Sequence, residues 1–408
     1  MKLLILLIVI IYFIFNTLLS ILNYRNRNAE IPEEVKDVYD EVSYKKWHQY
    51  NMENFRFSIV TSFIDLVILL LLLIFNIFAE VHHLAQDWTQ SVPLQSIIII
   101  GFYIIVDYVV TIFTSYYGQF VIEEKYGFNK MTIKTFIFDK IKSLILIIII
   151  GGGIIYGLSN LYINNPDMFY LYAIIAAVLF IFIFNILYTK VFVRIFNKLT
   201  PLEEGELKNK IIEYSQSVGY EISKISMMDA SKRSSKLNAF FTGFGKFKHI
   251  VLYDTLVEKM TPDQIVSVLA HEIGHAKKRH TLQSFFFNII TIAINILVLS
   301  LCIKSNELGV AFGFNGANFG FGAIIFILLL QPISLLFDII LNPISRKFEY
   351  QADAFAVKYW PKEHLIDALK ILGRENFSNL TPHPLYVAIK YSHPPLDYRI
   401  KAILKYKE

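Results

Sequence analysis

The sequence predicts an all-α polytopic membrane protein with seven transmembrane helices, and three observations support this fold class. Of the 408 residues, 55% are hydrophobic and 18% are charged, against about 25% charged in ordinary globular domains. Seven apolar stretches reach the length of about 20 residues that a helix needs to cross a bilayer. The lone Cys302 excludes a disulfide scaffold, and 35 Phe with 24 Tyr exclude a disordered chain.

The expected spans are dense in Ile, Leu and Phe. They cover residues 3–22, 57–79, 96–116, 143–163, 168–193, 284–303 and 321–341. The first stretch resembles a signal peptide, but its apolar run is long for one, and cleavage would leave the basic segment 24–56 outside the membrane. We therefore expect an uncleaved first span.

The basic residues predict the orientation. Of the 39 Lys and Arg, all but Lys2 and Lys304 lie in alternate loops, at 24–56, 118–142, 190–279 and after 341. Basic loops stay in the cytoplasm, so we expect the amino terminus outside and the carboxyl terminus inside. In a membrane protein the net charge of +5 reflects this sidedness, and we expect no nucleic-acid partner.

A helix with a metal-binding pattern is expected just before the sixth span. Thr261, Pro262 and Gln264 form the start of a capped helix. His271-Glu272-Ile273-Gly274-His275 follows and places two imidazoles on one helical face. That spacing suits one Zn²⁺ ion per chain, with Glu272 as the general base.

The third ligand is expected just after the seventh span. Glu349 and Asp353 share a helical face there at i and i+4. A carboxylate ligand beside a carboxylate that orients an imidazole completes a His₂Glu catalytic site. We therefore expect Glu349 to bind zinc and Asp353 to support it.

Several ordered blocks of the chain resemble the type I CAAX prenyl endopeptidases, integral membrane zinc proteases with seven spans. The blocks are FVIEEKYGFNKMT (120–132), LTPLEEGELK (199–208), SKRSSKLNAFFTGFGKFKHIVLYDTL (231–256), LAHEIGHAKKRH (269–280), SRKFEYQADAFA (345–356) and YSHPPLDYRI (391–400). The resemblance implies zinc ligands His271, His275 and Glu349, and a large hydrated chamber between the helices. It also implies that His393 stabilises the tetrahedral intermediate and that Asn238 contacts the substrate.

These expectations divide the chain into four parts. Residues 1–195 hold the first five spans, and 284–341 hold spans six and seven. Residues 196–283 form a cytoplasmic zinc-peptidase part with the HEIGH helix. Residues 342–408 form the cytoplasmic carboxyl-terminal part that supplies the third ligand. Because neither polar piece is large enough to bury much core, we expect the two to pack together.

Substrate contacts are expected from a small β-hairpin. Residues 238–242 and 249–253 resemble two strands joined by a turn through Gly243 and Gly245. An extended peptide could add to a free strand edge, with Asn238 and Phe240 at the substrate. A purely structural hairpin is an equally good interpretation. For the oxyanion donor, Arg399 is an alternative to His393 and a further candidate substrate contact.

Three acidic residues, Asp65, Asp107 and Asp338, lie inside expected spans. A charge in hydrocarbon costs on the order of 3 kcal/mol, so we expect Asp107, the deepest, to face a hydrated interior. Four histidines are assigned no metal role: His82, His83, His280 and His383. His280 lies five positions after His275 and is expected to point off the ligand face.

The resulting hypothesis is a membrane zinc endopeptidase that removes three residues from prenylated C-a-a-X proteins or acts on other peptides, in contact with membrane lipid. A quality-control protease without prenyl specificity and a non-enzymatic channel or transporter are the alternatives. The membrane is the plasma membrane in a bacterium or the endoplasmic reticulum in a eukaryote. The sequence indicates no oligomeric state.

Overall fold

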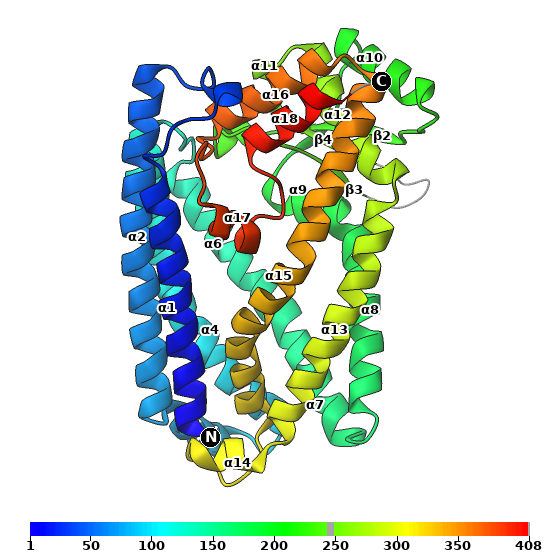
Figure 1. The fold of residues 1–408 in the computed structure, drawn as a ribbon. Helices are drawn as coiled ribbons and strands as arrows, with labels where there is room; N and C mark the ends of the chain where they lie inside the picture. Colours follow the sequence, from blue (N-terminus) through cyan, green and yellow to red (C-terminus); the bar gives the residue numbers. More distant parts are fainter. Residues whose placement is uncertain (243–248, 407–408) are drawn as a thin grey trace.

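The computed structural model describes residues 1–242 and 249–406. Within them, seven helical rods are long and apolar enough to cross a membrane. A domain of short helices and strands covers one end of the rods together with the C-terminus, while the N-terminus lies at the other end (Figure 1). The rods are α1 (Lys2–Asn26), α2 (Glu41–Ile74), α4 (Val92–Tyr117) with α5 (Glu124–Tyr126), α6 (Ile133–Leu146) with α7 (Gly152–Asn164), α8 (Phe169–Leu187) with α9 (Val193–Phe196), α13 (His280–Lys304) and α15 (Phe319–Tyr359). Short π-helical segments join the paired helices: η2 (Gly118–Glu123), η3 (Ile147–Gly151) and η4 (Tyr188–Phe192).

The second span ends earlier than the sequence predicts. The chain breaks at Asn76, whose φ of 55° is left-handed, and the expected residues 77–79 belong to a separate helix, α3 (Ile77–Trp88). The Lys2 ammonium donates to the Ile74 carbonyl and to the Asn76 side chain, both at 2.8 Å, and so holds the break. A contact 74 residues apart in sequence thus decides this boundary.

The rods pack on one another mainly at the end away from the domain. Buried positions of α8 are Phe169 and Ala173, at its start. In α15 the buried run 319–325 also lies at this end, and the next buried position is Asn342. Gly322 permits a close approach of α15 to α13, since a Cβ there would lie 2.6 Å from the Ile303 Cα. The short helix α14 (Asn306–Ala311) closes this end.

Away from this end the rods are less closely packed, and a cavity lies between them. One cavity of about 440 Å³ lies between α1, α2, α4 and α15. Asp65 and Asp107 both line it, which confirms that Asp107 faces the interior. Asp338 is half-buried on α15, within electrostatic range of Lys390. Facing this cavity rather than lipid lowers the free-energy cost of placing the Asp65 and Asp107 carboxylates within the membrane.

The domain contains a mixed four-stranded sheet in the order β1-β2-β4-β3. The expected pair is confirmed, since β3 (Ala239–Thr242) runs antiparallel to β4 (His249–Tyr253); its predicted turn at Gly243 and Gly245 falls outside the described residues. The sheet also contains β1 (Leu199–Pro201) and β2 (Lys224–Met228), which the sequence analysis missed. β2 pairs with β4 in parallel, and the partner of such a strand cannot be identified from local pattern alone.

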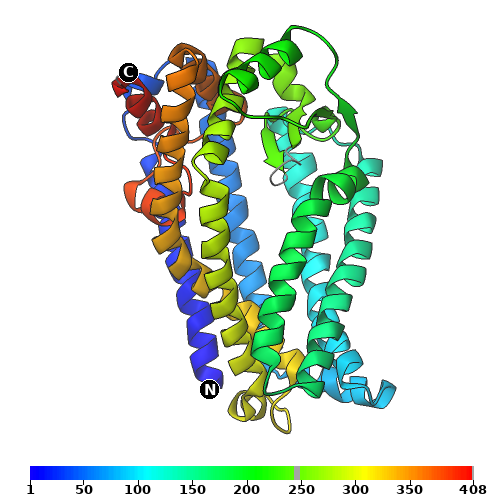
Figure 2. The same cartoon turned by 90° about the vertical axis from the view of Figure 1, so that its right-hand side faces the viewer.

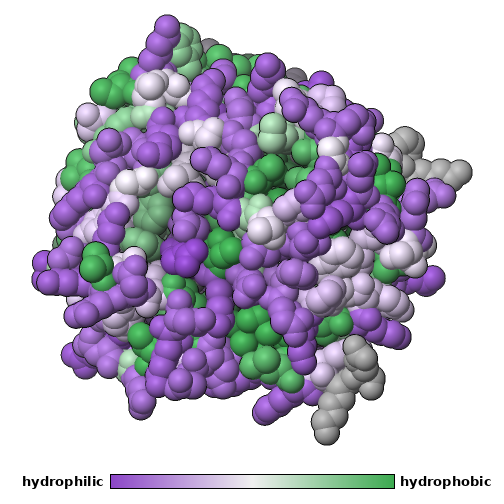
Figure 3. All heavy atoms as spheres, turned by 90° about the horizontal axis from the view of Figure 1, so that it is seen from above, coloured by the Kyte–Doolittle hydropathy of each residue, from purple (hydrophilic) through white to green (hydrophobic). Residues whose placement is uncertain are grey.

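The two polar pieces of the chain share one hydrophobic core, as expected from their sizes. Leu252, Leu256 and Ile265 of the first piece pack with Ala356 and Leu369 of the second. The helices are η1 (Glu33–Val35), α10 (Glu206–Ser217), η5 (Ala230–Lys232), α11 (Asp254–Lys259), α12 (Pro262–Lys277), α16 (Lys362–Glu375), α17 (Pro384–Lys390) and α18 (Leu396–Lys405). Figure 2 shows this domain capping the rods, and the face seen from above is mainly hydrophilic (Figure 3).

Candidate metal centre

Helix α12 begins as the sequence predicts. The Thr261 hydroxyl accepts from the Gln264 amide, the Gln264 side chain accepts from the Thr261 amide at 3.0 Å, and Pro262 occupies the first helical position. This capping box satisfies amide groups that would otherwise lack partners at the helix start. The fixed start places His271, Glu272 and His275 in the second half of the helix.

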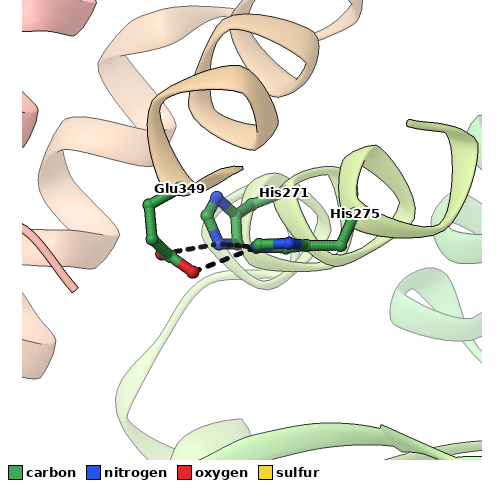
Figure 4. A group of neighbouring side chains, drawn as sticks. All are labelled: His271, His275 and Glu349. Carbon is green, nitrogen blue, oxygen red and sulfur yellow. Dashed lines mark hydrogen bonds and ion pairs between the residues drawn. The ribbon is translucent and has the colours of Figure 1, made fainter. Parts of the chain in front are cut away.

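Helix α15 crosses α12 with backbone contact, and this crossing assembles the site. Gly274 is the contact point, since a Cβ there would lie 3.0 Å from the Ala352 carbonyl oxygen and 3.1 Å from its Cα. Glu349 lies about one turn before Ala352 and reaches the two imidazoles (Figure 4). The glycine between the two histidines therefore permits the approach of the third candidate ligand.

The two imidazoles and the Glu349 carboxylate approach one another closely enough to share a metal ion, with one carboxylate oxygen nearest each imidazole. His271 Nε2 lies 3.2 Å from His275 Nε2 and 3.4 Å from Glu349 Oε2, and His275 Nε2 lies 3.2 Å from Glu349 Oε1. Ligand distances of 2.0–2.1 Å in a tetrahedron place neighbouring donors about 3.3 Å apart. Glu349 Oε2 is also buried without a hydrogen-bond donor. The residues present therefore fit a single divalent ion.

Asp353 and Arg399 support His271 from behind. His271 Nδ1 lies 2.8 Å from Asp353 Oδ1, and Asp353 is 1% exposed. Burial, the largest influence, lowers the pKa of His271, and Arg399 lowers it too, but the neighbouring carboxylates of Asp353 and Glu349 outweigh both and raise it to about 9. The pocket thus favours positive charge at the point where the candidate ligands meet.

A cavity of about 580 Å³ opens beside these residues. The predicted residues Glu272, Asn238, His393 and Arg399 line it together with the candidate ligands. Asn185 of α8, with Thr281 and Ser284 of α13, extends the lining onto two membrane rods. The cavity therefore connects the polar domain to the membrane part.

Tyr220 is a cavity residue that the sequence analysis missed. Burial, and next the neighbouring Glu272 carboxylate, raises the pKa of Tyr220 to about 12. Its hydroxyl is thus neutral at physiological pH and able to donate. No motif marks this position, since it follows Gly219 in an irregular segment.

His393 and Arg399, the alternative oxyanion donors, lie in different surroundings. His393 is on the loop before α18, with 65% of its side chain exposed and its Nε2 3.4 Å from Glu349 Oε1. Arg399 donates through Nε and Nη2 to both oxygens of Asp353, at 2.9 and 2.6 Å. Two of its nitrogens are thus occupied, whereas His393 presents its ring to the cavity.

Strand β3 is an edge strand, and its residues alternate between two faces. Ala239 and Phe241 line the cavity. Phe240, predicted to contact substrate, instead packs against the rings of Tyr188 and Tyr253. Successive side chains of a strand point to opposite faces, so Phe241 rather than Phe240 lines the cavity, and the substrate contact of Phe240 stays a prediction.

Three histidines outside the motif have structural contacts. His82 lies 3.3 Å from the Asn318 amide at the far end of the bundle, and the exposed His83 lies beside it. His383 accepts from the Leu385 amide and caps α17. The placement of His280 differs from the prediction, because it contacts His275.

Comparison with known proteins identifies the family. Residues 201–407 match peptidase family M48, and residues 20–198 match the family described as CAAX prenyl protease N-terminal, five membrane helices. The chain belongs to peptidase family M48.

Relatives of this M48 member match it over nearly its whole length. It is 34% identical to CAAX prenyl protease 1 of Saccharomyces cerevisiae, over 94% of this chain and 91% of the relative. It is 34% identical to the CAAX prenyl protease 1 homolog of Arabidopsis thaliana, over 97% and 95%. The crystal structure of Ste24p from S. mikatae has a TM-score of 0.93 and 33% identity, with 99% of both chains covered.

Family membership and the rods together establish the class of protein. This M48 peptidase is a multi-pass membrane metalloendopeptidase, a hydrolase that acts on peptide bonds. The family implies a metal, and the grouped His271, His275 and Glu349 are its candidate ligands. Family membership therefore favours an enzyme over the alternative of a non-enzymatic channel or transporter.

Proposed function

We propose that this M48 peptidase is a zinc endopeptidase that removes the last three residues of prenylated C-a-a-X proteins. The observation that carries the proposal is the grouping of His271, His275 and Glu349 at a cavity that reaches two membrane rods. The relatives named CAAX prenyl proteases support this substrate class. The isoprenoid would enter between spans while the peptide lies in the domain.

Zinc is the proposed metal because the donors are two imidazoles and one carboxylate, the set found in many zinc peptidases. When bound, zinc supplies Lewis-acid activation of water and of the scissile carbonyl. His271 and His275 would each contribute Nε2, and Glu349 one or both carboxylate oxygens. Asp353 accepts from His271 Nδ1 and so directs the Nε2 lone pair toward the ion.

Glu272 is the proposed general base. It follows His271 on α12, is half-buried, and lines the same cavity. Its carboxylate would accept a proton from the attacking water and deliver it to the departing amine. Because the Glu272 carboxylate faces the cavity, it can make both proton transfers without a movement of α12.

His393 is the proposed donor to the oxyanion. Its Nε2 lies 3.4 Å from Glu349 Oε1, which places the ring at the side of the ligand group. The loop that carries it brings the ring over the cavity, so an N–H can reach charge that develops on the carbonyl oxygen. Arg399 donates hydrogen bonds to Asp353 and would stabilise the position of that carboxylate.

The substrate backbone is proposed to pair with the free edge of β3. In the sheet β3 pairs with β4 on one side, so its other edge can add a strand. Asn238 immediately precedes the strand and lines the cavity, where its amide can fix the register of the peptide. Main-chain pairing accommodates varied side chains, as cleavage of many C-a-a-X tails requires.

We also propose that the domain is cytoplasmic and the amino terminus lies outside. The loops with nearly all Lys and Arg share the domain end of the rods, and basic loops remain in the cytoplasm. The membrane would be the endoplasmic reticulum in a eukaryote and the plasma membrane in a bacterium. Membrane lipid then contacts the apolar outer faces of the rods.

The test is cleavage of a farnesylated C-a-a-X peptide by purified protein, with the same peptide without farnesyl as the matched substrate. Mass spectrometry should show loss of three residues from the farnesylated peptide, and a zinc chelator should abolish it. Glu272→Gln should retain zinc while the rate falls roughly 10²–10⁴-fold, the usual contribution of a general base.

Each contrary outcome has a distinct meaning. Cleavage by Glu272→Gln at the wild-type rate would eliminate the mechanism. Equal cleavage of the two peptides would contradict the prenyl specificity and favour the quality-control alternative.

A further inference from the structure

An abrupt change of chain direction brings His280 back to the metal centre. Helix α12 ends at Lys277, Arg279 adopts a left-handed conformation with φ of 58°, and α13 begins at His280. On an unbroken helix, five residues would separate the two side chains by about 140° around the axis. In the structure, His280 Nδ1 instead lies 3.0 Å from His275 Nδ1.

The hydrogen bonds around His280 form a directed chain. A neutral imidazole that binds metal through Nε2 carries its proton on Nδ1, so His275 Nδ1 must donate and His280 Nδ1 must accept. His280 then carries its proton on Nε2, which lies 2.8 Å from the Gln351 side-chain oxygen. The proton on His275 Nδ1 therefore determines the positions of the other protons in this chain.

Packing fixes the orientation of the His280 ring. His280 is 2% exposed and stacks on Phe348 with centroids 4.2 Å apart and an interplanar angle of 9°. Phe348 and Gln351 flank Glu349 on α15. His280 thus links His275 on α12 to the helix that supplies the third candidate ligand.

We propose that His280 is a positioning residue that holds His275 in the tautomer and orientation needed to bind zinc through Nε2. This inference rests on the proposed role of His275 as a ligand. His271 has the Asp353 carboxylate behind it, whereas His275 has a neutral imidazole backed by the Gln351 amide. Such outer partners commonly change metal affinity 10–100-fold when removed.

The experiment measures zinc affinity of the full-length protein in detergent by competition with a chelator. His280→Phe keeps an aromatic ring that can stack on Phe348 but removes the acceptor, and His280→Gln restores an oxygen that can accept. We expect the zinc dissociation constant to rise about 10–100-fold for His280→Phe. For His280→Gln it should return most of the way to the wild-type value. The matched control His83→Phe, on the exposed face of α3, should leave it unchanged.

Two further measurements separate positioning from folding. Zinc-free His280→Phe should still unfold in one cooperative transition, as zinc-free wild type does, and the visible spectrum of its Co²⁺ form should differ from the wild-type spectrum. Wild-type zinc affinity in His280→Phe, equal weakness of the Phe and Gln variants, or loss of the cooperative zinc-free transition would each overturn the inference. Failure of the wild type to bind zinc would instead refute the proposed function.

Discussion

The substitution Gly274→Ala tests how the site is assembled. Gly274 lies between the two candidate histidine ligands, and its hydrogen faces the backbone of α15. Intrinsic propensity favours Ala over Gly in a helix by about 1 kcal/mol. If α12 acted alone, the substitution would stabilise the protein. The structure predicts the opposite, because two of the atoms that the new methyl group meets are main-chain atoms.

The expected displacement follows from the contact distances. The added Cβ would lie 3.1 Å from both the Ala352 Cα and the Phe355 Cβ, and 3.0 Å from the Ala352 oxygen. Carbon atoms pack best at about 3.5–4.0 Å, so the overlap is about 0.4–0.9 Å. Backbone atoms cannot rotate away, and the two helices must separate. Metal sites tolerate shifts of about 0.2 Å in ligand distance. The separation would therefore move the Glu349 carboxylate too far from the metal position to bind well.

We expect Gly274→Ala to weaken zinc binding by at least about tenfold, the lower end for changes that displace ligands, and overpacking to cost about 1–3 kcal/mol. Chelator competition measures the affinity, and thermal unfolding of the zinc-free protein measures the strain. The matched control is Gly101→Ala on α4, where no atom lies within 4 Å of the added methyl group. Zinc affinity of Gly274→Ala within twofold of wild type would refute the reasoning.

Three further predictions concern the proposed oxyanion donor, the substrate strand and the acid stability of the sheet. His393→Ala should lower kcat by about 10²–10³-fold, as expected for one lost oxyanion donor, while zinc affinity stays unchanged; an unaltered kcat would exclude this role. The Asn376 amide makes hydrogen bonds of 2.9 and 3.1 Å to both main-chain groups of Leu237, next to Asn238. These bonds are worth roughly 1 kcal/mol each, so their loss in Asn376→Ala should raise KM by up to about 30-fold without affecting zinc, and peptide titrations would contradict this if KM stayed constant. Burial, then the charges of Lys224 and Arg194, lowers the pKa of His249 to about 4. Because the folded protein keeps His249 neutral, its stabilising contribution is complete above about pH 6.5 and is lost as the pH falls toward 4. Unfolding temperatures of His249→Gln should therefore depend less on pH in this range than those of wild type, and parallel curves would count against the assignment.

Local signals in the sequence were sufficient for the membrane class and for the group that could hold a metal. Hydropathy over about 20 residues predicted rods that the structure contains, because crossing a bilayer depends on each helix alone. The spacing of His271 and His275 and the capping box at Thr261 also belong to one helix. Glu349 and Asp353 were found because they share a face of a second helix. Each of these properties is set by neighbours within a few turns.

The relative placement of elements was decided by the tertiary structure. His280 contacts His275 because one left-handed residue, Arg279, reverses the chain, and periodicity assumes that no such reversal occurs. Phe241 lines the cavity and Phe240 does not, because the pairing of β3 with β4 determines which face of β3 meets the cavity. Both outcomes depend on contacts that no short window of sequence contains.

The sequence by itself thus determined that the chain has apolar helices long enough to cross a membrane and which side chains are the candidate metal ligands. Only the tertiary structure decided that α12 and α15 cross at Gly274, that Arg399 binds Asp353, and that the rods meet mainly at one end and leave space between them. The physical reason is range. Hydropathy and helical spacing act over a few residues, whereas the crossing of two helices is settled by backbone and side-chain contacts between segments that are far apart in the chain.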